Sequence, residues 1–116
     1  MKKLSPNFSR YEFACKCTCG QDTVDAELLA VLEDIREHFG RAVTINSGNR
    51  CKNYNETIGG VKHSQHLTGR AADIVVDGVD SAVVYRYVDK TYPCSLGLGG
   101  YREFTHIDSR NKRARW

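Results

Sequence analysis

The sequence predicts a single α+β domain covering residues 1–116. Three observations predict it: two amphipathic helical patterns, short β-branched or apolar runs between them, and the absence of an internal repeat or linker. A chain of 116 residues is long enough to bury a core without crosslinks. We therefore expect a small antiparallel sheet packed against helices, in a chain that acts as a monomer.

The first helical elements lie in the N-terminal third of the chain. Ser9 followed by Glu12 fits a capping box, which predicts a short helical turn over residues 10–13. In VDAELLAVLEDIREHFG, apolar residues recur at steps of three and four, Asp25 can cap the start and Gly40 can end it. This segment predicts a long amphipathic helix that serves as scaffold.

The middle of the chain predicts two strands separated by an irregular crossing. The β-branched run 42–45 is typical of a strand, and the turn signal NSGNR that follows leaves Arg50 just beyond its end. Residues 51–60 read as a helical turn or an irregular segment. The run RAADIVV, residues 70–76, alternates and then becomes continuously apolar, as a strand entering a core does.

A second helix and a last strand complete the outline. Asp80 can cap the segment 81–92, which has one apolar face, and Pro93 stops it. The glycine-rich stretch after Cys94 leads to a final strand that carries His106. The order is therefore helix, strand, irregular crossing, strand, helix, strand.

Composition excludes several classes of protein. The apolar fraction is 41% and the charged fraction 27%, close to the averages of soluble domains. The net charge of +3 does not imply nucleic acid, and the basic run 110–116 is typical of a solvated, poorly ordered chain end. No window predicts a membrane span, and the first residues lack the apolar stretch of a secretory signal. We expect a protein made in the cytoplasm without a signal peptide.

The cysteines leave several interpretations open. The chain has five: Cys15, Cys17, Cys19, Cys51 and Cys94. The CKCTCG segment could supply part of a second metal site together with Cys51, or form a stapled loop after oxidation. Reduced, partly buried thiols are the interpretation we favour, and a second metal site is the less favoured one. A further alternative makes these cysteines the principal metal site.

Two histidines and an aspartate form the candidate catalytic centre. A catalytic zinc takes three protein ligands and keeps one position for water, and His66, Asp73 and His106 could supply such a set. Gly69 permits a turn that lets the first two converge. Glu103 precedes His106 by three residues, so their cooperation requires a bulge or bend near the preceding glycines.

These residues resemble those of a known family. SQHLTGRAAD matches the SxHxxGxAxD signature of the zinc D-alanyl-D-alanine carboxypeptidase family, EFTH matches its ExxH element, and INSGNR resembles its SGYR segment. The resemblance covers most of the chain and implies the fold shared with Hedgehog signalling domains. The roles it implies are zinc binding by His66, Asp73 and His106, a general base at Glu103, substrate or oxyanion contact by Arg50, and lining of the site by Ser64.

The resemblance also implies a substrate. The family includes VanX-type D,D-dipeptidases and phage endolysins, so we expect hydrolysis of peptidoglycan stem peptides by a carboxypeptidase or an endopeptidase, in a phage or prophage lytic enzyme that reaches the cell wall after release. The SGYR tyrosine is Asn49 here, and some relatives carry histidine where Glu103 stands. Asp108 is therefore either a competing base or a partner that orients His106. The alternative function is a noncatalytic, zinc-stabilised binding or structural module of the same fold.

Overall fold

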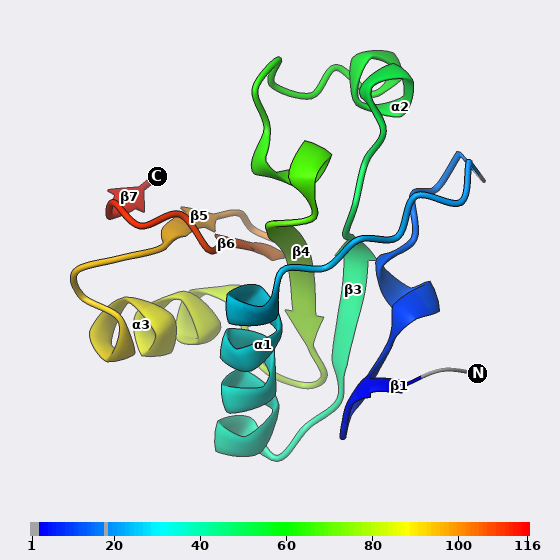
Figure 1. Ribbon diagram of the computed structural model, residues 1–116. Helices are drawn as coiled ribbons and strands as arrows, with labels where there is room; N and C mark the ends of the chain where they lie inside the picture. The colour runs from blue at the N-terminus through cyan, green and yellow to red at the C-terminus, as the bar shows by residue number, and fades with distance from the viewer. Residues whose placement is uncertain (1–2, 18) are drawn as a thin grey trace.

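The computed structural model describes residues 3–17 and 19–116 (Figure 1). Its strands are β1 (Lys3–Ser5), β2 (Phe8–Ser9), β3 (Val43–Ser47), β4 (Ala71–Val76), β5 (Gly97–Gly100), β6 (Thr105–Asp108) and β7 (Ala114–Arg115). Its α-helices are α1 (Ala26–Phe39), α2 (Lys52–Thr57) and α3 (Ser81–Thr91), and its 3-10 helices are η1 (Arg10–Phe13) and η2 (Gln65–Thr68). The predicted α+β class is confirmed.

Within the described residues, five strands form the main sheet in the order β3-β4-β6-β5-β7. The pairs are antiparallel except β5 with β7, which is parallel, and β1 and β2 form a separate antiparallel pair. Helix α1 packs against β3 and β4, whereas α3 packs against β5 and β6 (Figure 1). The central strands β4 and β6 therefore have one face towards the helices.

The alternation along β4 and β6 separates the core from the site. Ala72, Ile74 and Ile107 belong to the hydrophobic core cluster, which also contains the buried faces of α1 and α3. Successive residues of a strand point to opposite faces of the sheet. Asp73 and His106 therefore lie on the other face, away from α1 and α3.

Local signals position the helices as the sequence predicts. Asp25 caps α1 by accepting from the Leu28 N–H, and Gly40 ends it in the left-handed region with φ of 60°. Asp80 caps α3 in the same way, through the Ala82 N–H. Carboxylates at this position satisfy amides that have no partner within the helix.

The C-terminal segment differs from the prediction. Residues 110–116 were expected to be a solvated chain end, but Ala114 and Arg115 form β7 beside β5. The Arg115 guanidinium donates to the carbonyls of Tyr92, Ser95 and Leu96 and to the Asp89 carboxylate. The prediction was wrong because a basic side chain can satisfy buried carbonyls, which composition does not reveal.

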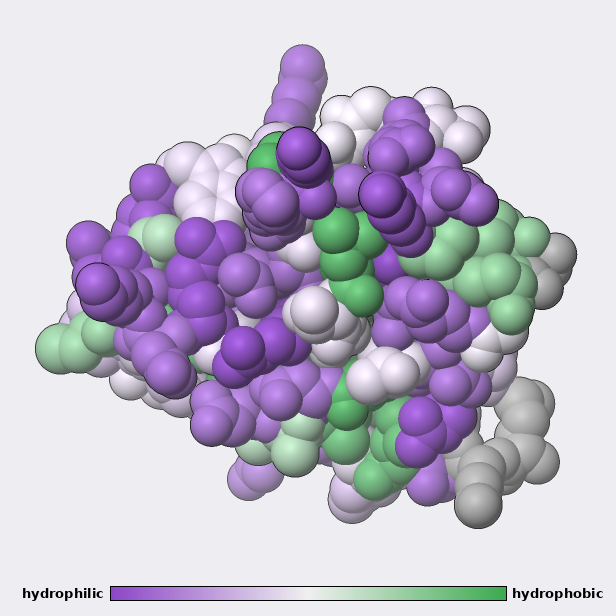
Figure 2. Space-filling view, turned by 45° about the horizontal axis from the view of Figure 1, so that its top comes forward, coloured by the Kyte–Doolittle hydropathy of each residue, from purple (hydrophilic) through white to green (hydrophobic). Residues whose placement is uncertain are grey.

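The glycine-rich stretch also differs from the prediction of one last strand. It forms a strand of its own, β5, which turns at residues 101–104 into β6. The face turned forward in Figure 2 is mostly hydrophilic, with hydrophobic side chains in small separate groups. None of the helices in the described part of the chain is long and apolar enough to cross a membrane.

Candidate metal centre

Two neighbouring strands and one short helix bring the three predicted ligands together. Asp73 of β4 and His106 of β6 are direct cross-strand partners. His66 lies in η2, just before β4, and its N–H donates to the Ser64 hydroxyl over 3.1 Å. Gly69 then ends η2 with φ of 72°, a conformation that favours glycine. This tight turn brings His66 back over β4.

The three side chains converge on one point. Asp73 Oδ1 lies 2.9 Å from His106 Nδ1 and 3.3 Å from His66 Nε2. One ligand atom from each residue lies within 4.8 Å of the others. All three residues are at most 9% exposed. Two imidazoles and one carboxylate are a donor set found at catalytic zinc.

The hydrogen bonding of His66 leaves one ring nitrogen for a metal ion. Its Nδ1 lies 2.7 Å from the Gly48 carbonyl oxygen, which can only accept, so Nδ1 carries the proton. In this tautomer Nε2 carries the lone pair, and this atom is buried and has no hydrogen-bond partner in the described residues. This lone pair faces the Asp73 carboxylate oxygen. Two acceptors this close favour a cation between them, so the site fits a metal.

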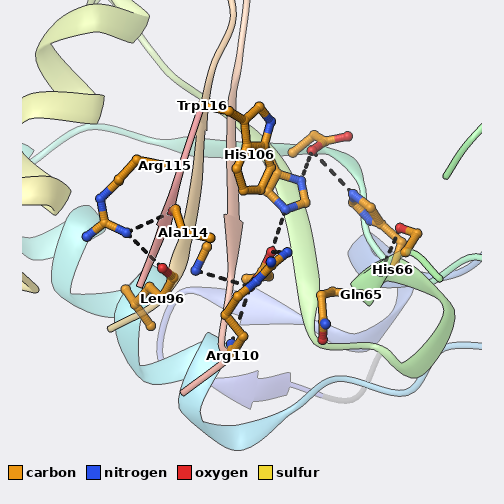
Figure 3. Close-up of polar contacts among 12 residues, drawn as sticks. Gln65, His66, Leu96, His106, Arg110, Ala114, Arg115 and Trp116 are labelled. Carbon is orange, nitrogen blue, oxygen red and sulfur yellow. Dashed lines mark hydrogen bonds and ion pairs between the residues drawn. The ribbon is translucent and has the colours of Figure 1, made fainter. Parts of the chain in front are cut away.

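His106 is oriented by a charged pair behind it. Its Nε2 donates to Asp108 Oδ2 over 2.8 Å, which leaves Nδ1 towards Asp73 (Figure 3). The Asp108 carboxylate is fully buried and also accepts from Arg110 Nε at 2.7 Å and from the Gly97 N–H at 3.1 Å. A Cβ at Gly97 would collide with this carboxylate. Such partners fix the tautomer and direction of a metal-binding imidazole.

Charge and burial act in opposite directions at these groups. Burial alone would raise the pKa of Asp73, but the hydrogen bond with His106 holds that pKa well below its usual range. Burial likewise opposes ionisation of Asp108, yet His106 and Arg110 lower its pKa. Burial alone would lower the pKa of His106, but its hydrogen bonds to Asp108 and Asp73 raise it. Both carboxylates therefore remain charged at neutral pH.

Arg50 contacts the centre from the loop after β3. Its Nη2 lies 3.2 Å from Asp73 Oδ2, its Nε donates to Ser47 Oγ, and its Nη1 donates to Asn55 Oδ1. A guanidinium has five N–H donors, so two remain after these three bonds. The side chain is about one-eighth exposed, at 12%, and lines the cleft beside the ligands.

A cleft of about 490 Å³ opens over the ligands. Trp116 and the Tyr101–Phe104 pair form an aromatic wall, with the rings of that pair stacked at 4.5 Å. The Trp116 ring lies beside that of His106, 5.1 Å away (Figure 3). The Trp116 Nε1 donates to the Tyr101 hydroxyl over 3.0 Å. The other lining residues are Arg50, Ile58, Gly59, Gly60, Val61, Ser64, His66, Asp73 and His106.

A comparison with protein families identifies the family of the chain. A family model described as Peptidase M15 matches residues 6–108, which include Arg50, His66, Asp73, His106 and Asp108. The chain belongs to the Peptidase M15 family. A comparison with curated proteins found no match.

Membership of the M15 family confirms the resemblance found in the sequence. The family is zinc-dependent, so the chain is a metallopeptidase whose substrate contains peptide bonds. Its metal would be held by His66, Asp73 and His106. Their donor atoms lie close together, and the lone pair on His66 Nε2 accepts no hydrogen bond, so it is available to a metal ion.

The structure does not bring Glu103 to the M15 centre. Glu103 lies exposed in the turn between β5 and β6 and lines a separate pocket with residues of β4 and α3. Its neighbour Phe104 lines the cleft instead. Asp108 lies behind His106 and not in the cleft, which is the position of an orienting partner. The general-base role of Glu103 stays a prediction. The turn at residues 101–104 would have to rearrange to bring the Glu103 carboxylate into the cleft.

Three contacts of the centre were not predicted from the sequence. The Gly48 carbonyl gives no signal because any residue has one. Arg110 could have been found, since His106, Asp108 and Arg110 follow the two-residue period of a strand face. Trp116 could not, because its position depends on β7 pairing with β5.

Proposed function

We propose that this M15 metallopeptidase hydrolyses peptide stems of peptidoglycan at bonds that involve D-amino acids, as a carboxypeptidase or an endopeptidase. The observation that carries the proposal is the convergence of three buried ligand groups and Arg50 at one cleft. Zinc held by His66, Asp73 and His106 would supply Lewis-acid activation of water and of the scissile carbonyl.

Arg50 provides positive charge beside that position. Its two remaining N–H groups can bind a substrate carboxylate or the negative charge that develops on the scissile carbonyl oxygen. Its bond to Asp73 Oδ2 also orients the carboxylate ligand. Ser64 holds the backbone of His66 and lines the cleft, so it supports both the ligand and the substrate.

The aromatic wall suits a peptide stem. Trp116, Tyr101 and Phe104 offer flat apolar surfaces beside the polar ligands. Small stem side chains can pack on such surfaces while the main chain contacts the polar groups. We further propose that the protein acts on the cell wall after release from the cytoplasm, as a phage or prophage endolysin does.

Glu103 is the proposed base, and its substitution is the first prediction. Glu103→Gln should reduce kcat by about 10²- to 10⁴-fold, because the base takes a proton from the attacking water and passes it to the leaving amine. Zinc content should stay unchanged, because Glu103 lies in the turn and lines a pocket that includes none of the three metal ligands. Steady-state kinetics and metal analysis on the same sample measure both.

The matched control is Glu56→Gln, another exposed glutamate, which lies in α2 outside the cleft lining. It should leave both kinetics and zinc content unchanged. Unaltered kcat in Glu103→Gln would remove Glu103 from the mechanism.

The activity itself is tested on defined peptidoglycan fragments. The zinc-loaded protein is incubated with stem peptides of known sequence, with and without a chelator, and the products are identified by mass spectrometry. Loss of a terminal D-alanine shows a carboxypeptidase, whereas an internal cut shows an endopeptidase. A zinc-loaded protein that cuts neither would contradict the proposal and favour the noncatalytic module, with which the position of Glu103 agrees.

A further inference from the structure

A second group of metal-binding side chains lies outside the centre. The sulfur atoms of Cys15, Cys17, Cys19 and Cys51 all lie within 4.8 Å of one another, and we call this group the cysteine cluster. Cys17 Sγ is 3.5 Å from Cys15 Sγ and 3.4 Å from Cys51 Sγ. A disulfide bond is about 2.05 Å long, so these are contacts between separate sulfur atoms.

The spacing of these sulfur atoms fits a tetrahedral metal site. Zinc binds thiolates at about 2.3 Å, which places tetrahedral sulfur ligands about 3.8 Å apart. The Cys17–Cys15 and Cys17–Cys51 sulfur distances are slightly shorter than this, and no two sulfur atoms of the cluster are more than 4.8 Å apart. Small side-chain rotations would therefore complete the tetrahedron.

Backbone amides support three of the four sulfur atoms. The Cys51 N–H donates to Cys15 Sγ over 3.4 Å, and the Tyr54 N–H donates to Cys51 Sγ over 3.4 Å. The Gln21 N–H points to Cys19 Sγ over 3.5 Å. Donors of this kind stabilise the negative charge of metal-bound thiolates.

We propose that the cysteine cluster binds a second zinc ion with a structural role. Four thiolates close the coordination shell and leave no position for water or substrate, which distinguishes structural from catalytic zinc. Cys17 and Cys19 are exposed, so the ion can reach the cluster from solvent. The site is separate from the centre formed by His66, Asp73 and His106.

This second zinc would connect the N-terminal loop to the segment that presents Arg50. Cys15, Cys17 and Cys19 come from a part of the sequence distant from Cys51, which precedes α2, and their sulfur atoms meet. In Figure 1 this N-terminal loop and α2 lie towards the same end of the sheet. Next to the cluster, the Gln21 side chain donates to the Arg50 carbonyl over 3.1 Å and to Asn49 Oδ1 over 2.5 Å. The Cys15 N–H in turn donates to the Gln21 carbonyl over 2.8 Å. Metal at the cluster would thus fix the backbone on which the Arg50 side chain depends.

Metal stoichiometry tests the proposal directly. The full chain is purified without an affinity tag or chelator, under reducing conditions, and zinc is measured per chain. We expect two equivalents for the unaltered protein, one for Cys17→Ser, one for His66→Ala, and two for the control Cys94→Ser, which changes an exposed cysteine outside the cluster. Cys51→Ser is a second test of the cluster, because serine can still accept the Tyr54 N–H that Cys51 accepts.

Cobalt substitution identifies the ligands independently of activity. Cobalt bound by thiolates gives an intense sulfur-to-metal charge-transfer band, which should be present in His66→Ala and absent in Cys17→Ser and Cys51→Ser. A single zinc that His66→Ala removes and Cys17→Ser retains would overturn the proposal. So would disulfide bonds within the cluster in protein purified anaerobically without reductant. Neither readout depends on hydrolysis, so failure of the proposed peptidase activity would not affect the result.

Discussion

The two imidazoles of the metal centre are held by different acceptors. His66 donates to a backbone carbonyl, whereas His106 donates to the Asp108 carboxylate. A carboxylate partner makes the ring a stronger electron donor than a carbonyl does. The Asp108 carboxylate is fully buried, but its negative charge is paired with the Arg110 guanidinium. The protein therefore does not bury an unpaired charge there.

Substitution of Asp108 should weaken metal binding without removing a ligand. Asp108→Asn keeps the size of the side chain but loses its charge, so zinc affinity at the centre should fall by about 10- to 100-fold. Competition with a chromophoric chelator measures the zinc affinity. The Cys17→Ser background removes the cysteine cluster, so that only zinc at the centre is measured. Asp34→Asn is the control, since Asp34 is also a hydrogen-bonded carboxylate but binds Tyr87 and Tyr92 far from the centre. Equal affinities in both variants would show that Asp108 does not orient His106.

At the scale of elements, the short strand β7 completes one wall of the cleft. It pairs with β5 and carries Trp116 to its position beside His106. A Cβ at Gly99 would collide with the Trp116 indole, so the glycine makes room for it. A strand of two residues has little pairing energy of its own, and the Arg115 hydrogen bonds hold it in place.

Removal of the Arg115 side chain should release this wall. Arg115→Ala should lower the free energy of unfolding by about 2 kcal/mol, because four carbonyls lose a charged donor. The chain has one tryptophan, so urea titration followed by its fluorescence measures stability, and a red-shifted native spectrum reports exposure of Trp116. The control Arg113→Ala removes an ion pair to Asp89 from a half-exposed side chain and should cost less than about 1 kcal/mol. Similar losses in the two variants would contradict this account of β7.

At the scale of the whole molecule, the helices and the metal centre lie on opposite faces of the sheet. The core cluster packs β4 and β6 against the helices on one face of the sheet. Asp73 and His106 project from these strands to the other face, where η2 and the C-terminal segment cover them. Ligands on packed strands keep their positions better than ligands on loops, and metal bound there stabilises the fold that presents them.

Metal binding should therefore raise thermal stability in a pH-dependent way. Zinc at about 100 times its Kd adds about 2.7 kcal/mol, so its removal should lower Tm by roughly 10 °C near neutral pH. The increment should shrink as pH falls, because protons and zinc compete for the same nitrogen of His106. The raised pKa of His106 works in the same direction: the protonated ring stabilises the metal-free fold below its ordinary value of 6.5, and this stability is lost as pH rises through the raised pKa.

Differential scanning calorimetry with and without zinc, over a range of pH in the Cys17→Ser background, measures this increment. His38→Gln serves as the control because His38 stacks on Tyr87 and does not contact the centre. It should keep the full pH dependence. An increment that grows as pH falls would contradict the assignment of His106 as a ligand.

The sequence by itself determined the elements whose signals are local. The helix α1 with its caps Asp25 and Gly40, the helix α3 after Asp80, and the apolar strand β4 were predicted close to their observed positions. Periodicity and capping act over a few residues, so they can be read directly from the sequence. The motif spacing likewise indicated His66, Asp73 and His106, which the fold brings together.

Only the tertiary structure decided how distant segments meet. The register of β4 with β6 sets Asp73 opposite His106, the pairing of β7 with β5 brings Trp116 to the cleft, and the turn at 101–104 takes Glu103 away from it. The same holds for the cysteine cluster, in which Cys51 contacts Cys17, a residue 34 positions earlier in the sequence. These contacts depend on strand register and chain reversal, which are set by packing of the whole domain and not by any local pattern.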